Sequence, residues 1–427
     1  MPSTSLSNLS SSKLARNIFV GMVLGLIVGL ILHALPDVQS AWAQTYLTQG
    51  ILSLGALLFL TSIKIIVVPL IAVSLMYAMT RLGRGAHIGR LGLKTISLYL
   101  FTSIFAIVLA MVFATLFNLG QGLEIPAQLL QEKPLGPSLE QFITGFIPKP
   151  ILDVLMGRQL IALIVLSLGL GFAINYMGQV GVALAQKIEK LNEIILHILI
   201  VMIRFTPYGV FCLTAQSFAY SGIGMVGILV KYMLVMLLVL FLHVALTSTL
   251  LLRIMAGLNM KLFFQKMSTA MLMAFSTTSS NMALPVSMDT VHRKLGVSKP
   301  LANFAMPLGA TLNMDGGAVL QGMATIFIAN YYGVDFSALD YCMVVLAALI
   351  ATVGTAGVPS VGPVMLVFVL QWVGLPLEGV GLILGVDKFL EMFRTTVNIT
   401  GDAMVACVVA KSEQELDLGV YNAPIRK

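Results

Sequence analysis

The chain has 427 residues, of which 58% are hydrophobic and 10% are charged. Because an ordinary soluble domain has roughly 25% charged residues, this composition excludes a soluble globular protein and indicates a polytopic membrane protein. The net charge of +7 indicates no nucleic-acid partner, since the basic residues fall between apolar runs and form no stripe with interleaved aromatic residues.

Apolar runs of some 20 residues are long enough to cross about 30 Å of hydrocarbon. Eight such runs occur, near residues 17–35, 51–79, 95–117, 151–176, 193–218, 224–252, 300–330 and 376–410. Residues 1–16 are polar and are followed by no cleavage pattern, so we interpret them as a tail and not as a removable signal peptide. Basic residues cluster on alternate loops, which predicts a plasma-membrane (inner-membrane) protein with both termini in the cytoplasm.

Two further apolar segments, 262–291 and 340–373, each consist of two short arms around a polar tip. Arms of about 10 to 14 residues fit re-entrant helical hairpins better than full crossings; ordinary helices kinked by Gly and Pro are the alternative. A hairpin followed by a span occurs twice in succession, which predicts inverted repeats with a site near the bilayer midplane. The expected fold is therefore all-α, with eight transmembrane helices plus two re-entrant hairpins.

The last span carries polar residues on one face of an otherwise apolar helix. These residues are Asp387, Glu391, Arg394, Asn398 and Asp402. Their spacings of three or four residues place them within roughly 80° of one another on a helix. A buried ion-pair network that merely joins helices is the alternative, but intramembrane ionisable residues usually mark a substrate or ion pathway.

A second polar site lies in the seventh run. Asn313 and Asp315 are two residues apart and would point about 200° away from each other in a regular helix. Gly316 and Gly317 follow directly and favour a break, after which the carboxylate, the amide and freed carbonyls converge on one hard cation. Oxygen ligands suit Na⁺, whereas proton coupling requires only a protonatable acid. An ordinary Asp-Gly turn is the alternative.

These stretches resemble the dicarboxylate/amino acid:cation symporters, a family that includes archaeal aspartate transporters and mammalian glutamate transporters. The resemblance rests on TTSSNMALP in the first hairpin, NMDGG at 313–317, GTAGVPSVG at 354–362 and RTTVNITGD at 394–402. It implies an elevator-type transporter that works as a homotrimer in the lipid bilayer and carries a small-molecule substrate.

The same resemblance implies a division of the chain. Residues 17–256 are mostly scaffold and trimerisation domain, except that the third and sixth spans belong to the transport domain. Residues 257–411 form the transport core, and 412–427 form a cytoplasmic tail.

The resemblance also implies a substrate site. Arg394 matches the arginine that pairs with the side-chain carboxylate of an acidic substrate, and Glu391 matches the acid that receives its α-amino group. A guanidinium fork suits a carboxylate. The other matching substrate positions are Thr395, Asn398, Ser279, Ser280, Gly357, Val358 and Gly317.

Na⁺ positions follow in the same way. A first is matched by Asp402, Asn398, Asn313 and Gly309; a second by Thr311, Thr352, Val353 and Thr355; a third by Tyr99, Thr102, Ser103, Asn313 and Asp315. The spacing of Tyr99, Thr102 and Ser103 puts them on one helical face. Gln321 stands where proton-coupled relatives have a glutamate, so the chain is more similar to members driven by Na⁺ alone. No organic cofactor is expected.

Several departures from the family pattern leave the substrate open. Glu391 is one methylene longer than the usual Asp, Gly317 replaces a threonine, and Phe393 adds bulk beside Arg394. We expect Na⁺-coupled uptake of an acidic amino acid, aspartate before glutamate. Cystine, a neutral amino acid, an amine-free C4 dicarboxylate and H⁺ coupling are alternatives.

Two other classes of protein can also bury polar residues. An anion-conducting channel is one, although a mixed Arg, Glu and Asp face favours an occluding site. An enzyme is not expected, because the polar face lacks a nucleophile with a positioned base. The five histidines, His243 among them, show no metal-ligand spacing, and we interpret them as packing or surface residues.

Overall fold

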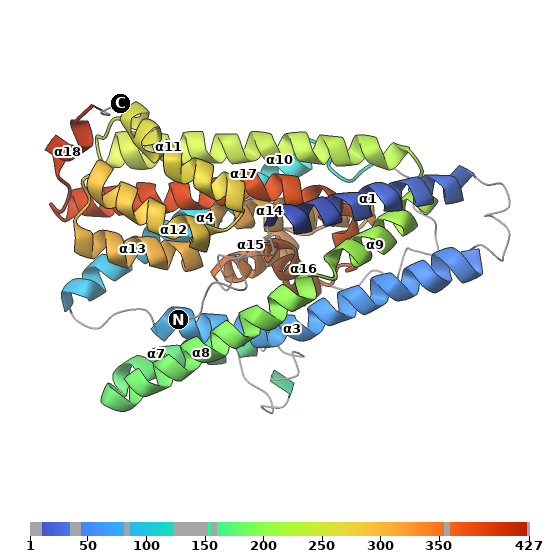
Figure 1. Ribbon diagram of the computed structural model, residues 1–427, viewed down its shortest axis with the longest axis horizontal. Helices are drawn as coiled ribbons and strands as arrows, with labels where there is room; N and C mark the ends of the chain where they lie inside the picture. The colour runs from blue at the N-terminus through green and yellow to red at the C-terminus, as the bar shows by residue number, and fades with distance from the viewer. Residues whose placement is uncertain are drawn as a thin grey trace.

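The computed structural model describes residues 11–34, 44–80, 86–122, 153–154, 160–353 and 359–424. Regular structure within these ranges is helical, with one isolated β-bridge between Val297 and Leu416. The all-α expectation is therefore confirmed, and Figure 1 shows the longer helices running roughly along the long axis of the molecule.

The described helices divide into those of the first half of the chain, up to Met255, and those of the second half, from Met260 onward. In the first half they are α1 (Ser11–Ala34), η2 (Gln44–Leu52, π-helical), α3 (Ser53–Thr80), α4 (Ala86–Leu116), α7 (Leu160–Tyr176), α8 (Gly178–Ile203), α9 (Thr206–Ser221), α10 (Gly224–Ser248) and η4 (Thr249–Met255, π-helical). In the second half they are α11 (Met260–Thr277), α12 (Ser280–Asp289), η5 (Thr290–Lys294, π-helical), α13 (Lys299–Leu312), α14 (Asp315–Tyr331), α15 (Ala338–Val353), α16 (Gly362–Val373), α17 (Gly379–Ser412) and α18 (Leu418–Asn422).

Four helical stretches of the described chain are long and apolar enough to cross a membrane, namely Arg16–Ala34, Tyr46–Tyr77, Arg90–Leu116 and Gly224–Met255. Many of their large apolar side chains are exposed, including Ile65 at 69% and Phe241 at 70%. Exposed apolar surface on this scale marks contact with lipid or with another protein surface. Other predicted spans are divided or polar: α13 and α14 are separate helices, and α17 carries the polar face.

The run predicted as a single span over 193–218 is divided between α8 and α9, which are bent by 49° relative to each other. Arg204 and Phe205 separate them, and Pro207 lies in the first turn of α9. Proline is tolerated in a first turn because no intrahelical partner is needed there for its missing N–H, but it does not continue a preceding helix. Counted as one bent span, this pair is a fifth candidate crossing.

The two predicted hairpins are pairs of adjacent helices, α11 with α12 and α15 with α16. The second arms, α12 and α16, have 10 and 12 residues, too few to cross about 30 Å at 1.5 Å per residue. Thr278 has a left-handed backbone between α11 and α12 (φ 51°), and the Ser279 hydroxyl caps α12 by accepting from Met282 N at 3.3 Å. Residues 354–358 at the second tip lie outside the described residues.

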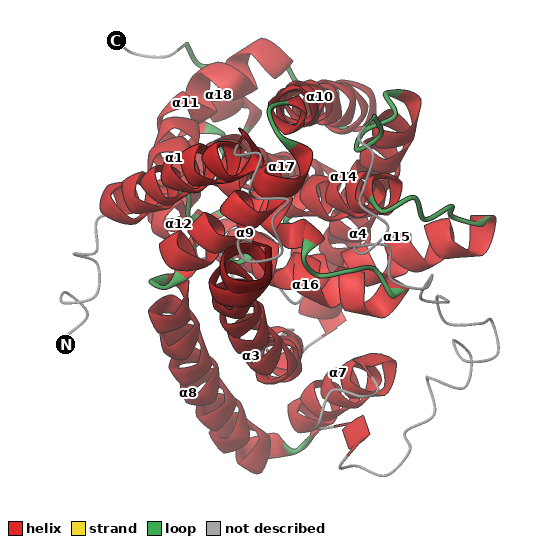
Figure 2. Ribbon diagram, turned by 90° about the vertical axis from the view of Figure 1, so that its right-hand side faces the viewer, coloured by secondary structure: helices red, strands yellow, loops and turns green. Residues whose placement is uncertain are grey.

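Helix α17 is the centre of the packing. It contacts α10, α11, α13 and α14, and Figure 2 shows it surrounded by other helices when the molecule is viewed end-on. Helices α7 and α8 instead pack on α3 at one edge. A close contact between α14 and α17 involves Gly316, where an added Cβ would lie 2.4 Å from the backbone oxygen of Arg394. Helices α14 and α17 therefore touch backbone to backbone.

The residues after α17 are tied to α4 in the first half and to α11 at the start of the second half. Glu413 is paired with Arg90 (2.5 Å) and Lys94 on α4. Lys266 of α11 is buried and donates to the carbonyl oxygens of Val420 (2.8 Å) and Tyr421 (2.6 Å). These contacts hold α18 against α11.

Candidate functional site

The predicted polar face of α17 is buried along its length. Asp387, Glu391, Arg394, Asn398 and Asp402 are all inaccessible or nearly so. A charged group in such surroundings is stable only when it is paired or bound to an ion. The partners of each residue therefore show what the site is built to hold.

The predicted break in the seventh run is present. Helix α13 ends at Leu312, Asn313 and Met314 have non-helical backbones (φ −117°, ψ 73° and φ −102°, ψ 63°), and α14 begins at Asp315. The two glycines lie inside the first turn of α14 and not in the break itself. Gly316 N–H donates to Asn398 Oδ1 at 2.8 Å, so α17 satisfies an amide at the start of α14 that has no partner within its own helix.

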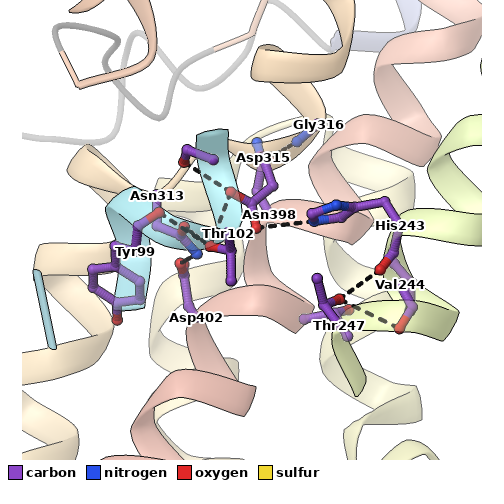
Figure 3. Close-up of polar contacts among 12 residues, drawn as sticks. Tyr99, Thr102, His243, Val244, Thr247, Asn313, Asp315, Gly316, Asn398 and Asp402 are labelled. Carbon is purple, nitrogen blue, oxygen red and sulfur yellow. Dashed lines mark hydrogen bonds and ion pairs between the residues drawn. The ribbon is translucent and has the colours of Figure 1, made fainter. Parts of the chain in front are cut away.

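Four oxygen atoms from α4 and the break converge beside Asp315 (Figure 3). Ser103 Oγ lies 2.8 Å from Asp315 Oδ1, and Thr102 Oγ1 lies 3.3 Å from the same atom and 3.0 Å from Asn313 Oδ1. Each of these side chains is buried. Neutral and anionic oxygens gathered in this way are the ligands that hard cations such as Na⁺ take in proteins.

Asp402 lies on the other side of Asn313. Asn313 Nδ2 donates to Asp402 Oδ1 at 3.0 Å, and Thr102 Oγ1 lies near both Asn313 Oδ1 and Asp315 Oδ1, so the amide and this hydroxyl together link the two buried acids. Gly309 leaves room for Asp402, because an added Cβ there would lie 2.4 Å from Asp402 Oδ1 and 2.7 Å from the Tyr99 hydroxyl. That hydroxyl donates to the carbonyl oxygen of Ala305 at 3.0 Å. The residues predicted for the first and third Na⁺ positions are therefore neighbours.

His243 is a member of this cluster that the sequence interpretation missed. It is buried, and its Nε2 lies 3.2 Å from Asp315 Oδ2. Figure 3 shows the ring reaching the carboxylate from α10, opposite Thr102. The interpretation of His243 as a packing or surface residue was therefore wrong. No local sequence motif indicates this contact, because Asp315 is 72 residues from His243 in the sequence.

The residues predicted for the second Na⁺ position are less well gathered. The hydroxyl of Thr311 donates to the carbonyl oxygen of Leu308 at 2.9 Å, and that of Thr352 donates to Ala348 at 2.7 Å. Val353 ends α15, and Thr355 lies outside the described residues. The side chains of Thr311 and Thr352 thus bond within their own helices.

Arg394 has unused hydrogen-bonding capacity. Its Nη2 lies 2.7 Å from Asp387 Oδ1, while Nε and Nη1 are buried and meet no acceptor within the described part of the chain. An added Cβ on Gly362 would lie 3.2 Å from Nη1, so the absence of a side chain there leaves the guanidinium open on that side. A buried guanidinium with two unpaired nitrogens is suited to bind an anion such as a carboxylate.

Glu391 is already paired. Its Oε2 lies 2.6 Å from Lys388 Nζ, and its Oε1 accepts a hydrogen bond from the Ser360 amide. Lys388 Nζ also donates to Thr278 Oγ1 at 3.1 Å, at the tip of the first hairpin. Sequence reasoning did not single out Lys388, although it lies one turn before Glu391.

The other predicted substrate residues are distributed around this pair of charges. Thr395 is buried, and its hydroxyl donates to the carbonyl oxygen of Glu391 at 2.8 Å. Ser279 and Ser280 are buried at the first hairpin tip. Gly317 has space, since an added Cβ would meet only Met314 Cβ at 3.5 Å. Gly357 and Val358 lie outside the described residues.

This arrangement combines a buried arginine that has two unpartnered nitrogens with an oxygen-lined acidic cluster, on helices that touch. The family model described as "Sodium:dicarboxylate symporter family" matches residues 14–412. The chain belongs to this family. It is accordingly a multi-pass membrane transporter that moves a small molecule together with a cation, and the family resemblance found in the sequence is confirmed.

Curated relatives cover nearly the full length. The chain is 31% identical over 425 residues to a "Proton/sodium-glutamate symport protein" of Bacillus subtilis (strain 168), covering 96% of this chain and 94% of the relative. It is 29% identical over 424 residues to a "Proton/glutamate-aspartate symporter" of Escherichia coli (strain K12), covering 95% and 94%. A "C4-dicarboxylate transport protein" of Bacillus subtilis (strain 168) is 25% identical over 414 residues, covering 95% and 96%.

Proposed function

We propose that the chain is a secondary active symporter that couples Na⁺ influx to the uptake of an acidic amino acid, aspartate or glutamate. The observation that carries the proposal is the face of α17, which bears both Arg394, with two unpartnered nitrogens, and Asp402, in the oxygen-lined cluster. Eight residues along a helix correspond to about 12 Å. One rigid element therefore joins the proposed substrate arginine to the proposed ion site.

The proposed Na⁺ ligands are the oxygens around the helix break. Asp315, Asn313, Thr102 and Ser103 form one position, and Asp402 with Asn313, Asn398 and Gly309 forms another. Two buried carboxylates linked through the Asn313 amide and the Thr102 hydroxyl repel each other in a low dielectric, and a bound cation removes that repulsion. Gln321 favours Na⁺ over H⁺, because it is a neutral amide whose Nε2 donates to the carbonyl oxygen of Gly362 at 3.1 Å.

Coupling follows from the contact between α14 and α17. Na⁺ bound at the break fixes Asn313 and Asp315, which begins α14. Gly316 packs on the backbone of Arg394 and bonds Asn398, so the position of the break and the position of the guanidinium are linked. Na⁺ thereby raises the affinity for the anionic substrate, and by reciprocity substrate raises the affinity for Na⁺.

The proposal includes the architecture expected from the family: eight spans, two re-entrant hairpins, both termini in the cytoplasm and an elevator motion within a homotrimer. Helices α4 and α10 pack against α14 and α17, whereas α7 and α8 pack only on α3 and on each other among the stronger contacts. This supports placing the third and sixth spans with the transport core. Native mass spectrometry tests the assembly, with three times the 45.8 kDa chain mass as the expected result.

The decisive experiment is uptake of labelled L-aspartate into liposomes that contain the purified chain. An inward Na⁺ gradient is expected to drive accumulation, and an inward proton gradient alone is not. Arg394→Met is expected to abolish uptake, while Arg293→Met, which removes an arginine that is 75% exposed, is expected to preserve it. Proton-driven uptake without Na⁺ contradicts the ion assignment, and undiminished uptake by Arg394→Met contradicts the substrate site.

A further inference from the structure

Lys388 occupies a place in the site that the transported molecule's own amino group is expected to occupy. Its Nζ lies 2.6 Å from Glu391 Oε2, and both side chains are largely buried, at 13% and 8% exposure. A distance of this size is that of a charge-assisted hydrogen bond between an ammonium and a carboxylate. The α-ammonium of aspartate bound to Glu391 would make the same interaction with the same acid.

Both oxygens of Glu391 are engaged. Oε1 accepts from the Ser360 amide, and Oε2 accepts from Lys388. A substrate ammonium must therefore share this carboxylate with Lys388, and two ammonium groups beside one acid repel each other. Glu391 is thus an acid whose cation is already supplied by the chain itself.

Arg394 presents the opposite case. Asp387 contacts only its Nη2, at 2.7 Å, and the buried Nε and Nη1 have no acceptor in the described ranges. Unpaired buried donors carry a desolvation cost that an incoming anion removes. The four charges of the cluster, on Asp387, Lys388, Glu391 and Arg394, sum to zero before substrate arrives. Within the described residues, the unmet need of the cluster is therefore an acceptor for the two unpaired Arg394 nitrogens, whereas Glu391 already has its cation.

We propose that Lys388 is a specificity-determining residue, a tethered ammonium that neutralises Glu391 so that the site accepts amine-free C4 dicarboxylates alongside aspartate. The inference rests on the proposed function, because it concerns the same substrate site. A dicarboxylate without an amine places one carboxylate on Arg394 and leaves the Lys388–Glu391 pair intact. Aspartate makes the same contact with Arg394 but brings a second ammonium to an acid that Lys388 already neutralises.

The surroundings of Lys388 favour this pairing over a displaced position. Lys388 lines a cavity of about 680 Å³, together with Thr278, Phe389, Met233 and Arg16. This cavity is the space into which a displaced lysine would move. Its lining is mostly apolar, and its fully charged member is another cation, so an ammonium there is less stable than one beside Glu391. Thr278, which accepts from Lys388 Nζ at 3.1 Å, fixes the ammonium from the hairpin side.

The test compares labelled succinate with labelled L-aspartate in Na⁺-driven liposome uptake. The wild-type chain is expected to take up both, with apparent affinities within about tenfold of each other. Lys388→Met is expected to weaken succinate uptake roughly tenfold and to strengthen aspartate binding severalfold, because Glu391 is then unpaired and repels an amine-free dianion while attracting an ammonium. Lys388→Arg retains the cation and is expected to keep the wild-type order of substrates. Lys231→Met, outside the site, is expected to leave the ratio unchanged.

Two results overturn the inference while leaving the proposed function intact. One is an aspartate-to-succinate ratio in Lys388→Met equal to that of the wild type. The other is wild-type protein that takes up aspartate and discriminates against succinate by more than about a hundredfold, and this result decides the matter even if Lys388→Met does not fold. Absence of Na⁺-driven uptake of either substrate by folded wild-type protein is a different outcome, which overturns the proposed function and the inference together.

Discussion

The helices that follow the two hairpins have the same place in the chain order but opposite construction. The first is divided at Asn313 and Met314 into α13 and α14, whereas α17 continues without a break for 34 residues through the buried polar face. At the break between α13 and α14, backbone groups and the acid Asp315 face the neighbouring helices. The continuous helix supplies side chains, because Asn398 accepts from Gly316 N–H and Asp402 accepts from Asn313 Nδ2.

This difference shows how an interrupted helix is tolerated in an apolar interior. A break leaves amide and carbonyl groups without intrahelical partners, and in a membrane such groups must be satisfied by protein, water or ions. Here a neighbouring unbroken helix stabilises the break through its amide and carboxylate. The same contacts fix the position of the break relative to Arg394. Structural support and coupling therefore depend on the same few atoms.

A substitution at Gly316 is the most direct way to disrupt the contact between α14 and α17. Gly316→Ala places a Cβ 2.4 Å from the Arg394 backbone oxygen and 2.6 Å from its Cα, so α14 and α17 must separate. We expect loss of Na⁺-driven uptake and a destabilisation of about 1 to 3 kcal/mol, measured by uptake and by thermal unfolding in detergent. Gly227→Ala in α10 is the control, because an added Cβ there meets nothing within 4 Å. Equal effects of the two substitutions would contradict the close packing.

Substitution of the two acids beside Asn313 tests the proposed Na⁺ positions. Asp315→Asn in the divided helix and Asp402→Asn in the continuous one each remove a negative charge from the proposed Na⁺ positions. We expect the Na⁺ concentration for half-maximal aspartate binding to rise roughly tenfold or more in each, since a charged ligand is replaced by a neutral one. Asp289→Asn, which removes an acid that is 55% exposed, is the control. Unchanged Na⁺ dependence at Asp315 or Asp402 would refute that assignment.

A smaller effect is expected at His243, which approaches Asp315 from α10. His243→Phe retains a ring beside Phe105, whose centroid is 5.9 Å from that of the histidine, but removes the bond to Asp315 Oδ2. Loss of one hydrogen bond of about 1 kcal/mol predicts a Na⁺ affinity lowered about fivefold, measured by the Na⁺ dependence of substrate binding. His197→Phe is a control, because its Nδ1 contacts the Glu193 carbonyl of its own helix. A stable His243→Phe protein with wild-type Na⁺ affinity would exclude a positioning role.

The smallest effect concerns the end of α17. A hydrogen bond from Lys94, and the charge of Arg90, hold the pKa of Glu413 below its ordinary value of 4.5. Because the pKa is lowered in the folded state, the stabilisation is complete above the unfolded pKa and is lost as pH falls through the folded one. We expect Glu413→Gln to lower the melting temperature at neutral pH and to match wild type in acid below about pH 4. A difference in melting temperature that persists at that pH would show that Glu413 does not stabilise the protein through its charge.

Periodicity predicted much of this arrangement, and its failures have physical causes. The 200° separation of Asn313 and Asp315 on a regular helix correctly required a break, and three- and four-residue spacings correctly placed the α17 face. The division of 193–218 was missed because its apolar pattern continues through Pro207. His243 and Lys388 were missed for a different reason: their partners are set by packing between helices, and a single helix pattern does not contain that information.

The contact of Lys266 with the carbonyls of Val420 and Tyr421 has a consequence for biosynthesis. Lys266 is translated more than 150 residues before these partners, and a buried ammonium without acceptors is costly. Until residues 420 and 421 have been synthesised, α11 cannot complete its docking. The first hairpin therefore reaches its final position only after α18 has been made, so truncation before Val420 is expected to impair assembly of a segment made much earlier.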